Sequence, residues 1–262
     1  MKLKELYKKL PVRQQARFRP FAEKAFYTFN LITLGQALLN PIGKVKTSFL
    51  VRPFLKKSVA QQGEDLILDR ILFRLLEIDL DEPGVVVDVG AYHPVDHSVT
   101  YLLYKRGWRG IAFDPSTTTR DSFKIWRPRD TFVCKAVGET DDVDVSFFVP
   151  KNASNQSLTN TKYPQKSDDY REIIVGQVNL NAELKRQNVS SIDILNIDIE
   201  GAELEVLKTF NFELFRPKVV AIEIHGNDIQ KALKTEEAQI LLDKGYRCSG
   251  CAVITYFFVR EE

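Results

Sequence analysis

Two short apolar runs, each ending at a carboxylate, stand out in the pattern of hydrophobic and polar positions. Residues 85–87 are three valines that precede Asp88, and residues 111–113 form an apolar run that precedes Asp114. Between them, apolar residues over 101–104 have helical spacing, and the glycine that follows is typical of a helix end. The pattern predicts a strand, a helix and a second strand in one βαβ unit, with ligands bound beyond the carboxyl ends of the strands.

The alternation of apolar runs and helical periods continues to the end of the chain. Strands are expected over residues 131–136, 144–149, 192–197 and 219–224, and helices over residues 177–187, 202–210 and 229–244. Residues 246–248 and 252–259 are expected to form an antiparallel hairpin around Ser249 and Gly250, and the polar residues 151–169 a long loop. The expected fold is therefore α/β, with a mainly parallel seven-stranded sheet and a C-terminal antiparallel hairpin. This is the Rossmann-like arrangement of class I methyltransferases.

The turn after the first strand indicates which nucleoside cofactor fits. A dinucleotide site needs three glycines so that backbone amides can approach a pyrophosphate, whereas this turn has Gly90 alone. Tyr92 would crowd a pyrophosphate, and Pro94 has no amide to donate. A cofactor without phosphates fits better, and S-adenosylmethionine is the common one. Asp114 would then accept hydrogen bonds from the ribose hydroxyls, and the methionine end would lie near Asp88 and Gly90.

The later strands supply the candidates for acid–base chemistry. One strand ends with Asp198 and Glu200, and the next ends with Glu223 and His225. Glu223 and His225 share a strand face because a single residue separates them. In this fold both strand ends open onto the same crevice as Asp88. Such groups could deprotonate a hydroxyl that attacks a sulfonium methyl. Asp198, Glu223 and His225 could instead bind Mg²⁺ or a transition metal, and a role in structural or substrate hydrogen bonding is a third alternative.

Several segments, in this order and spacing, resemble the FkbM-type methyltransferase family. They are QQGEDLIL at 61–68, VDVGAYHP at 87–94, YLLYKRGWRGIAFDPS at 101–116, FFVP at 147–150 and IDILNIDIEGAELEVLK at 192–208. The resemblance extends from about residue 61 to residue 259. It implies a Rossmann-like fold, S-adenosylmethionine as cofactor, and methylation of an oxygen on a sugar or polyketide-type acceptor.

The resemblance also implies roles for single residues. Asp198 and Glu200 would lie at the transfer site, Ala136 and Val137 would line the adenine, and Ala91 the methionine moiety. The segment around residues 62–64 would fold over the cofactor. Combined with the turn described above, the predicted cofactor-binding residues are Gln62, Glu64, Asp88, Gly90, Ala91, Tyr92, His93, Asp114, Pro115, Ser116, Ala136 and Val137.

The N-terminal part differs in charge from the rest of the chain. Residues 1–57 carry 13 Lys or Arg against two Glu, whereas residues 58–262 carry 24 basic and 33 acidic groups. Residues 25–42 are uncharged and apolar, with polar residues near one helical face, which predicts a partly amphipathic helix. That helix could pack on the domain or on a partner, contact an anionic membrane surface, or span a bilayer. We therefore expect a basic helical extension over 1–57 and a catalytic domain over 58–262.

The chemistry leaves three function classes to compare. An O-methyltransferase acting on a sugar, polysaccharide or secondary-metabolite hydroxyl is favoured, and a nicotinamide-dependent oxidoreductase is disfavoured because Gly90 stands alone. A non-catalytic membrane-associated scaffold is the third. Neither a secretory signal nor a nucleic-acid reader motif is recognisable, so we expect a cytoplasmic enzyme, peripheral on the membrane or free, with a small-molecule or glycan acceptor and a homodimer as an option. Cys248 and Cys251 are expected to flank the hairpin turn as free thiols.

Overall fold

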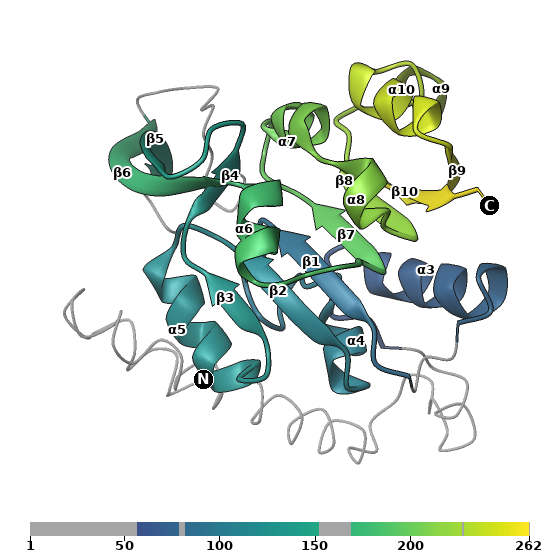
Figure 1. Ribbon diagram of the computed structural model, residues 1–262, viewed down its shortest axis with the longest axis horizontal. Coiled ribbons are helices and arrows are strands. Elements are labelled where there is room, and N and C mark those ends of the chain that lie inside the picture. Colours follow the sequence, from purple (N-terminus) through teal and green to yellow (C-terminus); the bar gives the residue numbers. More distant parts are fainter. Residues whose placement is uncertain (1–56, 79–81, 152–168, 227, 262) are drawn as a thin grey trace, which may run out of the picture. The chain divides into compact units, whose positions relative to one another are not determined.

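The computed structural model describes residues 57–78, 82–151, 169–226 and 228–261 (Figure 1). The basic extension, except Lys57, lies outside the described residues, and so does most of the expected polar loop. The boundary between residues 57 and 58 and the amphipathic helix therefore stay predictions. Within the described ranges, no helix is both long and apolar enough to cross a membrane.

The domain is built on a seven-stranded sheet with the order β3-β2-β1-β7-β8-β10-β9 (Figure 1). Neighbouring strands are parallel except β10, which is antiparallel to both β8 and β9. The chain runs outward from β1 to β3 and then returns to place β7 on the other side of β1, so the order reverses there. Ligands of open parallel sheets bind at such a reversal. The strands are β1 (Val85–Val89), β2 (Arg109–Phe113), β3 (Thr131–Val133), β7 (Ile194–Ile197), β8 (Val219–Glu223), β9 (Tyr246–Ala252) and β10 (Thr255–Arg260).

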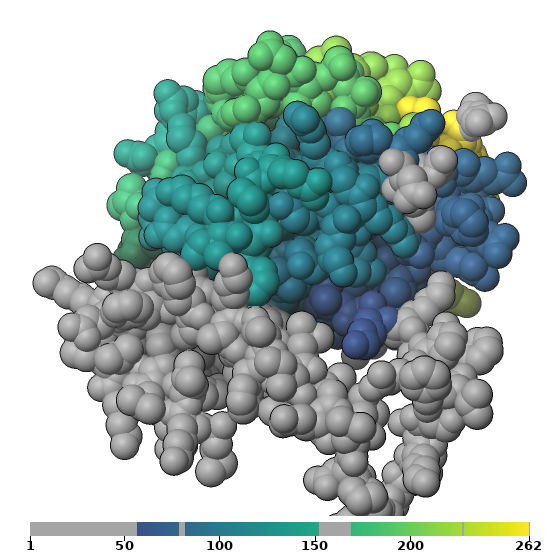
Figure 2. Space-filling view, turned by 90° about the horizontal axis from the view of Figure 1, so that it is seen from below, coloured from purple at the N-terminus to yellow at the C-terminus, as the bar shows by residue number. Residues whose placement is uncertain are grey.

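Helices cover both faces of the sheet because the strands are apolar on both sides. Val86 and Ile194 pack with Leu68 and Leu103 on one face, which is the face of α3, the adjoining π-helix and α4. Residues one position further along the strands pack on the other face, against α6, α7, α8 and α10. The helices are α3 (Glu64–Arg70), the π-helix (Ile71–Leu75), α4 (Tyr101–Lys105), α5 (Thr117–Trp126), α6 (Leu180–Arg186), α7 (Glu203–Thr209), α8 (Phe212–Phe215), α9 (Ile229–Ala232) and α10 (Glu236–Asp243). Figure 2 shows the domain from below, where segments up to β5 make most of the surface not drawn in grey.

A second sheet of three strands, which the sequence analysis did not predict, has the order β4-β6-β5. It consists of β4 (Ala136–Gly138), β5 (Val143–Pro150) and β6 (Tyr170–Asn179). The single strand expected over residues 131–136 is wrong, because the chain leaves the main sheet after Val133 and pairs again only from Ala136. The helix expected from residue 177 begins at Leu180 instead. Asn179 ends β6 and caps that helix by accepting hydrogen bonds from the next backbone amides.

Two C-terminal boundaries also differ from the prediction. The helix expected over residues 229–244 is two helices, because Thr235 accepts a hydrogen bond from the Ala238 amide and starts a new one. The hairpin turn lies after Ala252, with Val253 at a φ of 53°, and not at Ser249 and Gly250. Gly250 lies inside β9, next to the Ile67 side chain. Cys248 and Cys251 therefore both lie within one strand and do not flank the turn; both are free thiols.

Candidate active site

The predicted site carboxylates lie at or directly after the carboxyl ends of four adjacent strands. Asp88 lies in β1, where it is in register with Ala112 of β2 and Asn196 of β7. Asp114 follows β2, and Asp198 follows β7. Glu223 ends β8, the next strand of the sheet. Parallel strands present these ends along one edge, so the sequence-predicted carboxylates lie on the same side of the domain.

The turn after β1 is held tightly between its two neighbouring strands. The backbone amides of Gly90 and Ala91 both donate to the Phe113 carbonyl at 3.0 Å. Gly90 has a φ of +89°, and a Cβ at this position would lie 1.6 Å from the carbonyl oxygen of Asp198. Only glycine allows this approach without displacing the backbone of the turn that carries Asp198.

Asp88 belongs to a buried hydrogen-bonded network. Its carboxylate accepts hydrogen bonds from the Thr100 hydroxyl at 2.7 Å and from the Asn196 amide at 2.9 Å. Thr100 in turn accepts from the Arg127 guanidinium at 2.8 Å, and Arg127 forms a buried ion pair with Asp130 at 2.6 Å. Both carboxylate oxygens of Asp88 therefore have internal donors, and the side chain fixes the end of β1 relative to α4 and β7.

Asp114 is a buried carboxylate positioned by backbone amides. It accepts hydrogen bonds from the Ser116 amide at 2.7 Å and from the Tyr92 amide at 3.2 Å. Burial raises the pKa of its carboxyl to about 7, although these hydrogen bonds act in the opposite direction. Ser116 then caps α5 through its hydroxyl. The carboxylate at this strand end has the chemistry that a ribose diol needs from its partner.

The other predicted cofactor residues have varied surroundings. The Tyr92 ring is exposed and stacks on His97, whereas His93 is buried and its Nδ1 accepts hydrogen bonds from the two amides that follow in the turn. Ala136 and Val137 are buried in β4. The Pro115 carbonyl accepts a weak hydrogen bond from the Cys134 thiol at 3.6 Å.

The segment before α3 places Glu64 within electrostatic range of the carboxylates at the ends of the later strands. The Glu64 carboxylate accepts a hydrogen bond from the Gln62 amide at 2.7 Å and is buried. Its charge is close enough to Glu223 to raise the pKa of the Glu223 carboxyl. Among the residues that the structure describes, the buried Gln62 Oε1 has no hydrogen-bond donor. Glu64 thus lies near the carboxylates of the later strands.

The turn after β7 presents Asp198 and Glu200, and Glu203 anchors it from the start of α7. The Glu203 carboxylate accepts hydrogen bonds from the Ile199 and Gly201 amides, both at 2.9 Å. This arrangement holds Glu200 at a φ of 56°, in the left-handed region. Asp198 is accessible to solvent, yet protein surrounds it closely enough for desolvation, followed by the charge of Glu223, to raise its pKa well above the usual value.

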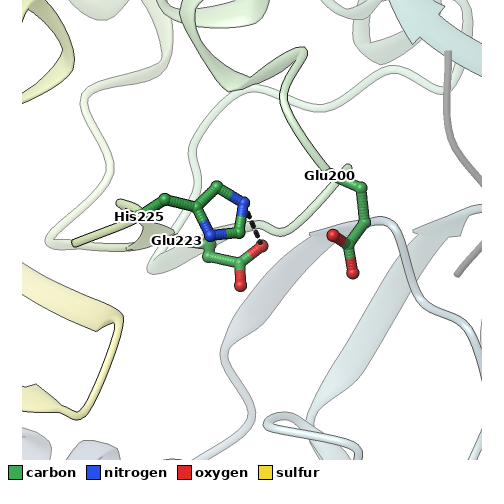
Figure 3. Close-up of side chains that lie close together, drawn as sticks. All are labelled: Glu200, Glu223 and His225. Atoms are coloured by element: carbon green, nitrogen blue, oxygen red, sulfur yellow. Dashed lines mark ion pairs between the residues drawn. The ribbon is translucent and has the colours of Figure 1, made fainter. Parts of the chain in front are cut away.

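Glu223 and His225 face the same space as Glu200 (Figure 3). Glu223 is 8% exposed, its Oε2 lies 3.8 Å from His225 Nε2, and His225 is largely exposed. Burial raises the pKa of Glu223 to about 7, and the neighbouring carboxylates contribute to the rise. Ligand atoms of Glu200, Glu223 and His225 lie within 4.8 Å of one another, and so do those of Asp198, Glu203 and Glu223. The four sequence-predicted catalytic candidates are thus brought together.

Sequence reasoning missed two residues at this site. Glu203 was part of a motif but received no role, although a carboxylate at the start of a helix beside a glycine turn is a signal for an anchor of loop amides. Tyr170 starts β6 and is buried, and desolvation, followed by the charge of Glu200, raises the pKa of its phenol. No sequence signal identified Tyr170, because its strand belongs to the sheet that was not predicted.

The strand order, with an antiparallel strand between the last two parallel ones, and carboxylates at the strand ends define a class I methyltransferase fold. The sequence matches the model of the methyltransferase FkbM domain over residues 88–248, which is more than half of the chain. The chain therefore belongs to the FkbM methyltransferase family. This match confirms the resemblance and the methyltransferase class, whose cofactor is S-adenosylmethionine. A search of curated proteins found no significant match.

Solved structures with related folds are distant in sequence. A TehB-like SAM-dependent methyltransferase from Corynebacterium glutamicum is 11% identical, with 81% of this chain and 93% of that chain covered and a TM-score of 0.40. CalS11, a TDP-rhamnose 3′-O-methyltransferase of calicheamicin biosynthesis, is 15% identical, with 90% and 94% covered and a TM-score of 0.41. Aeropyrum pernix fibrillarin with natively bound S-adenosyl-L-methionine is 14% identical, with 73% of each chain covered and a TM-score of 0.39.

Proposed function

We propose that this protein transfers a methyl group from S-adenosylmethionine to a hydroxyl oxygen of a sugar, polysaccharide or secondary-metabolite acceptor. The observation that carries the proposal is the convergence of Asp198 and Glu223 at the carboxyl ends of two adjacent strands, beside the turn formed by Gly90. A proton acceptor at this edge is what an attacking hydroxyl requires.

The residues near β1 and β2 fit the cofactor. Asp114 offers a carboxylate at the end of β2, each oxygen of which accepts one backbone amide and retains a lone pair for a ribose hydroxyl. The Gly90 turn adjoins the backbone of Asp198, so the cofactor side and the transfer side meet there. When bound, S-adenosylmethionine supplies an electrophilic methyl group on a sulfonium sulfur.

Asp198 is the residue that we assign to proton removal. As the acceptor oxygen took up the methyl group that the donor would supply from its sulfonium, the hydroxyl proton would pass to the Asp198 carboxylate. Glu203 fixes the turn that carries this carboxylate through the Ile199 and Gly201 amides, so the base is preorganised. Glu223 lies against Asp198 and favours proton uptake there, because a second negative charge raises the pKa of the Asp198 carboxyl.

The acceptor class rests on the family and on the composition of the chain. Residues 151–169 are rich in amide and hydroxyl groups, which suit hydrogen bonding to a polyol. An anionic membrane surface that binds residues 1–57 would place the enzyme near a membrane-linked acceptor, which fits a peripheral protein of the cytoplasm. We also propose a homodimer, which does not depend on residues 151–169 or on residues 1–57.

The test combines donor binding with methyl transfer. Purified protein is titrated with S-adenosylhomocysteine by calorimetry, and transfer from labelled S-adenosylmethionine is measured over a panel of sugar and polyketide-type hydroxyl acceptors. We expect Asp198→Asn to lower the transfer rate by about 10²- to 10⁴-fold while binding of S-adenosylhomocysteine is unchanged. Glu213→Gln, on α8 at the opposite edge of the sheet, is the matched control and should retain full activity. Full activity in Asp198→Asn would overturn the assignment of the base.

A further inference from the structure

Glu223 is a buried carboxylate that shares a side-chain hydrogen bond with Asp198 and has one further oxygen without a donor among the described residues. The side chain is 8% exposed, yet among the described residues its Oε2 has no hydrogen-bond partner. The Nε2 atom of His225 lies 3.8 Å from this oxygen, which is beyond hydrogen-bonding distance. A buried carboxylate oxygen without a donor is costly unless a proton or a cation meets it.

Other buried carboxylates of the described domain accept hydrogen bonds from donors at fixed positions, and Glu223 differs from them in its Oε2, which has no donor. Asp88, Asp114 and Glu203 each accept two hydrogen bonds, and Asp130 pairs with Arg127. The groups around Glu223 are themselves mostly acidic: Asp198, Glu200, Glu203 and Glu64. The strand ends of β7 and β8 thus concentrate negative charge around one buried oxygen.

The positions of the ligand atoms suit a metal ion. One ligand atom from each of Glu200, Glu223 and His225 lies within 4.8 Å of the other two, and Figure 3 shows the imidazole and both carboxylates directed toward a common space. Glu203 is less suited as a ligand, because each of its oxygens already accepts a backbone amide. The three remaining side chains leave further positions open for water or substrate.

We propose that Glu200, Glu223 and His225 bind one divalent cation of the Mn²⁺ type, which holds the acceptor hydroxyl during methyl transfer. Two carboxylates and one imidazole combine the oxygen ligands of Mg²⁺ and Mn²⁺ with a nitrogen ligand that favours a transition ion. A cation there lowers the pKa of a hydroxyl bound to it, and Asp198 remains the proton acceptor. This role of the cation rests on the proposed function, whereas its binding does not.

The test measures Mn²⁺ binding directly, without donor or acceptor. The electron paramagnetic resonance signal of free Mn²⁺ is followed as the purified full-length protein is added. We expect one ion per chain, with an affinity that falls at least tenfold in Glu223→Gln and in Glu200→Gln. Glu213→Gln should bind Mn²⁺ as the unchanged protein does. Circular dichroism and the melting temperature establish that each variant is folded.

Competition by Mg²⁺ tests the imidazole. His225 is largely exposed, so His225→Ala should fold normally, and we expect it to weaken Mn²⁺ binding more than Mg²⁺ binding. Absence of Mn²⁺ binding up to about 1 mM, or unchanged affinity in Glu223→Gln, would overturn the cation site. If the protein binds S-adenosylhomocysteine and transfers methyl groups but does not bind Mn²⁺, only the cation site fails. If it binds Mn²⁺ but no S-adenosylhomocysteine, the proposed function fails and the cation site stands.

Discussion

The carboxylates at the ends of β1 and β2 differ from those at the ends of β7 and β8 in what surrounds their oxygens. Asp88 and Asp114 each have two hydrogen-bond donors from the protein. Asp198 and Glu223 instead face each other, and the strongest charges acting on them are other carboxylates. The two pairs occupy equivalent places in the fold, so the strand ends alone do not determine what a carboxylate can do.

The difference separates positioning from chemistry. A carboxylate with fixed donors holds a conformation and presents a fixed hydrogen-bond acceptor, which suits recognition of a ligand such as a ribose. Asp198 and Glu223 share a hydrogen bond with each other, and a carboxylate pair of this kind binds a proton or a cation readily, which suits catalysis. Unsatisfied groups are therefore the better indicators of a reactive site in this domain.

The largest expected effect follows from Gly90, where the turn after β1 touches the turn after β7. Gly90→Ala should lower the free energy of unfolding by more than about 3 kcal/mol, because the new Cβ would lie 1.6 Å from the Asp198 carbonyl. Urea unfolding followed by circular dichroism measures the change. Gly107→Ala is the matched control: its φ is also positive, at +97°, but no atom lies within 4 Å of the new Cβ. It should cost only about 1–2 kcal/mol. An equal loss of unfolding free energy in the two variants would show that the contact between the turn after β1 and the turn after β7 is not tight.

Paired substitutions of aspartate by asparagine test the difference between the carboxylates of β1 and β2 and those of β7 and β8. Asp88→Asn should lower the free energy of unfolding by about 1–3 kcal/mol, because the Thr100 and Asn196 donors would lose a carboxylate partner. Asp198→Asn should leave stability unchanged or raise it at pH 8, since it removes a charge that burial and Glu223 disfavour. Urea midpoints of both variants provide the comparison. A clear loss of stability in Asp198→Asn would mean that the Asp198 carboxyl stabilises the fold through its contact with Glu223.

Much of the main sheet could be predicted because its signals are local. Buried parallel strands are continuous apolar runs, and β1, β2, β7 and β8 each end at or beside a carboxylate that marks the boundary. The convergence of Asp198 with Glu223 then follows from the rule that ligands bind at the carboxyl ends of such strands. The family resemblance added the identity of the chemistry.

The second sheet and the hydrogen bonds of the site could not be predicted in the same way. The strand β6 is exposed or half-buried through its middle, without regular alternation, and it pairs with β4, some 40 positions earlier in the chain. Its own pattern is therefore weak. The donors of Asp88 come from positions 12 and 108 residues away. Which carboxylate is satisfied depends on such distant partners, and a single sequence does not specify them.

The smallest expected effect concerns pH and the ribose carboxylate. The pKa of Asp114 is raised to about 7 in the ligand-free protein, so the group is largely protonated at pH 6 and ionised at pH 8. Ribose hydroxyls donate more strongly to the ionised form, and binding therefore favours loss of the proton. The affinity for S-adenosylhomocysteine should fall by up to about tenfold between pH 8 and pH 6, as measured by calorimetry. Asp114→Asn removes this titration, so its profile between pH 6 and pH 8 should be flat and its affinity low throughout. A pH dependence that persists in Asp114→Asn would assign the effect to another group and leave Asp114 as a structural residue of the turn.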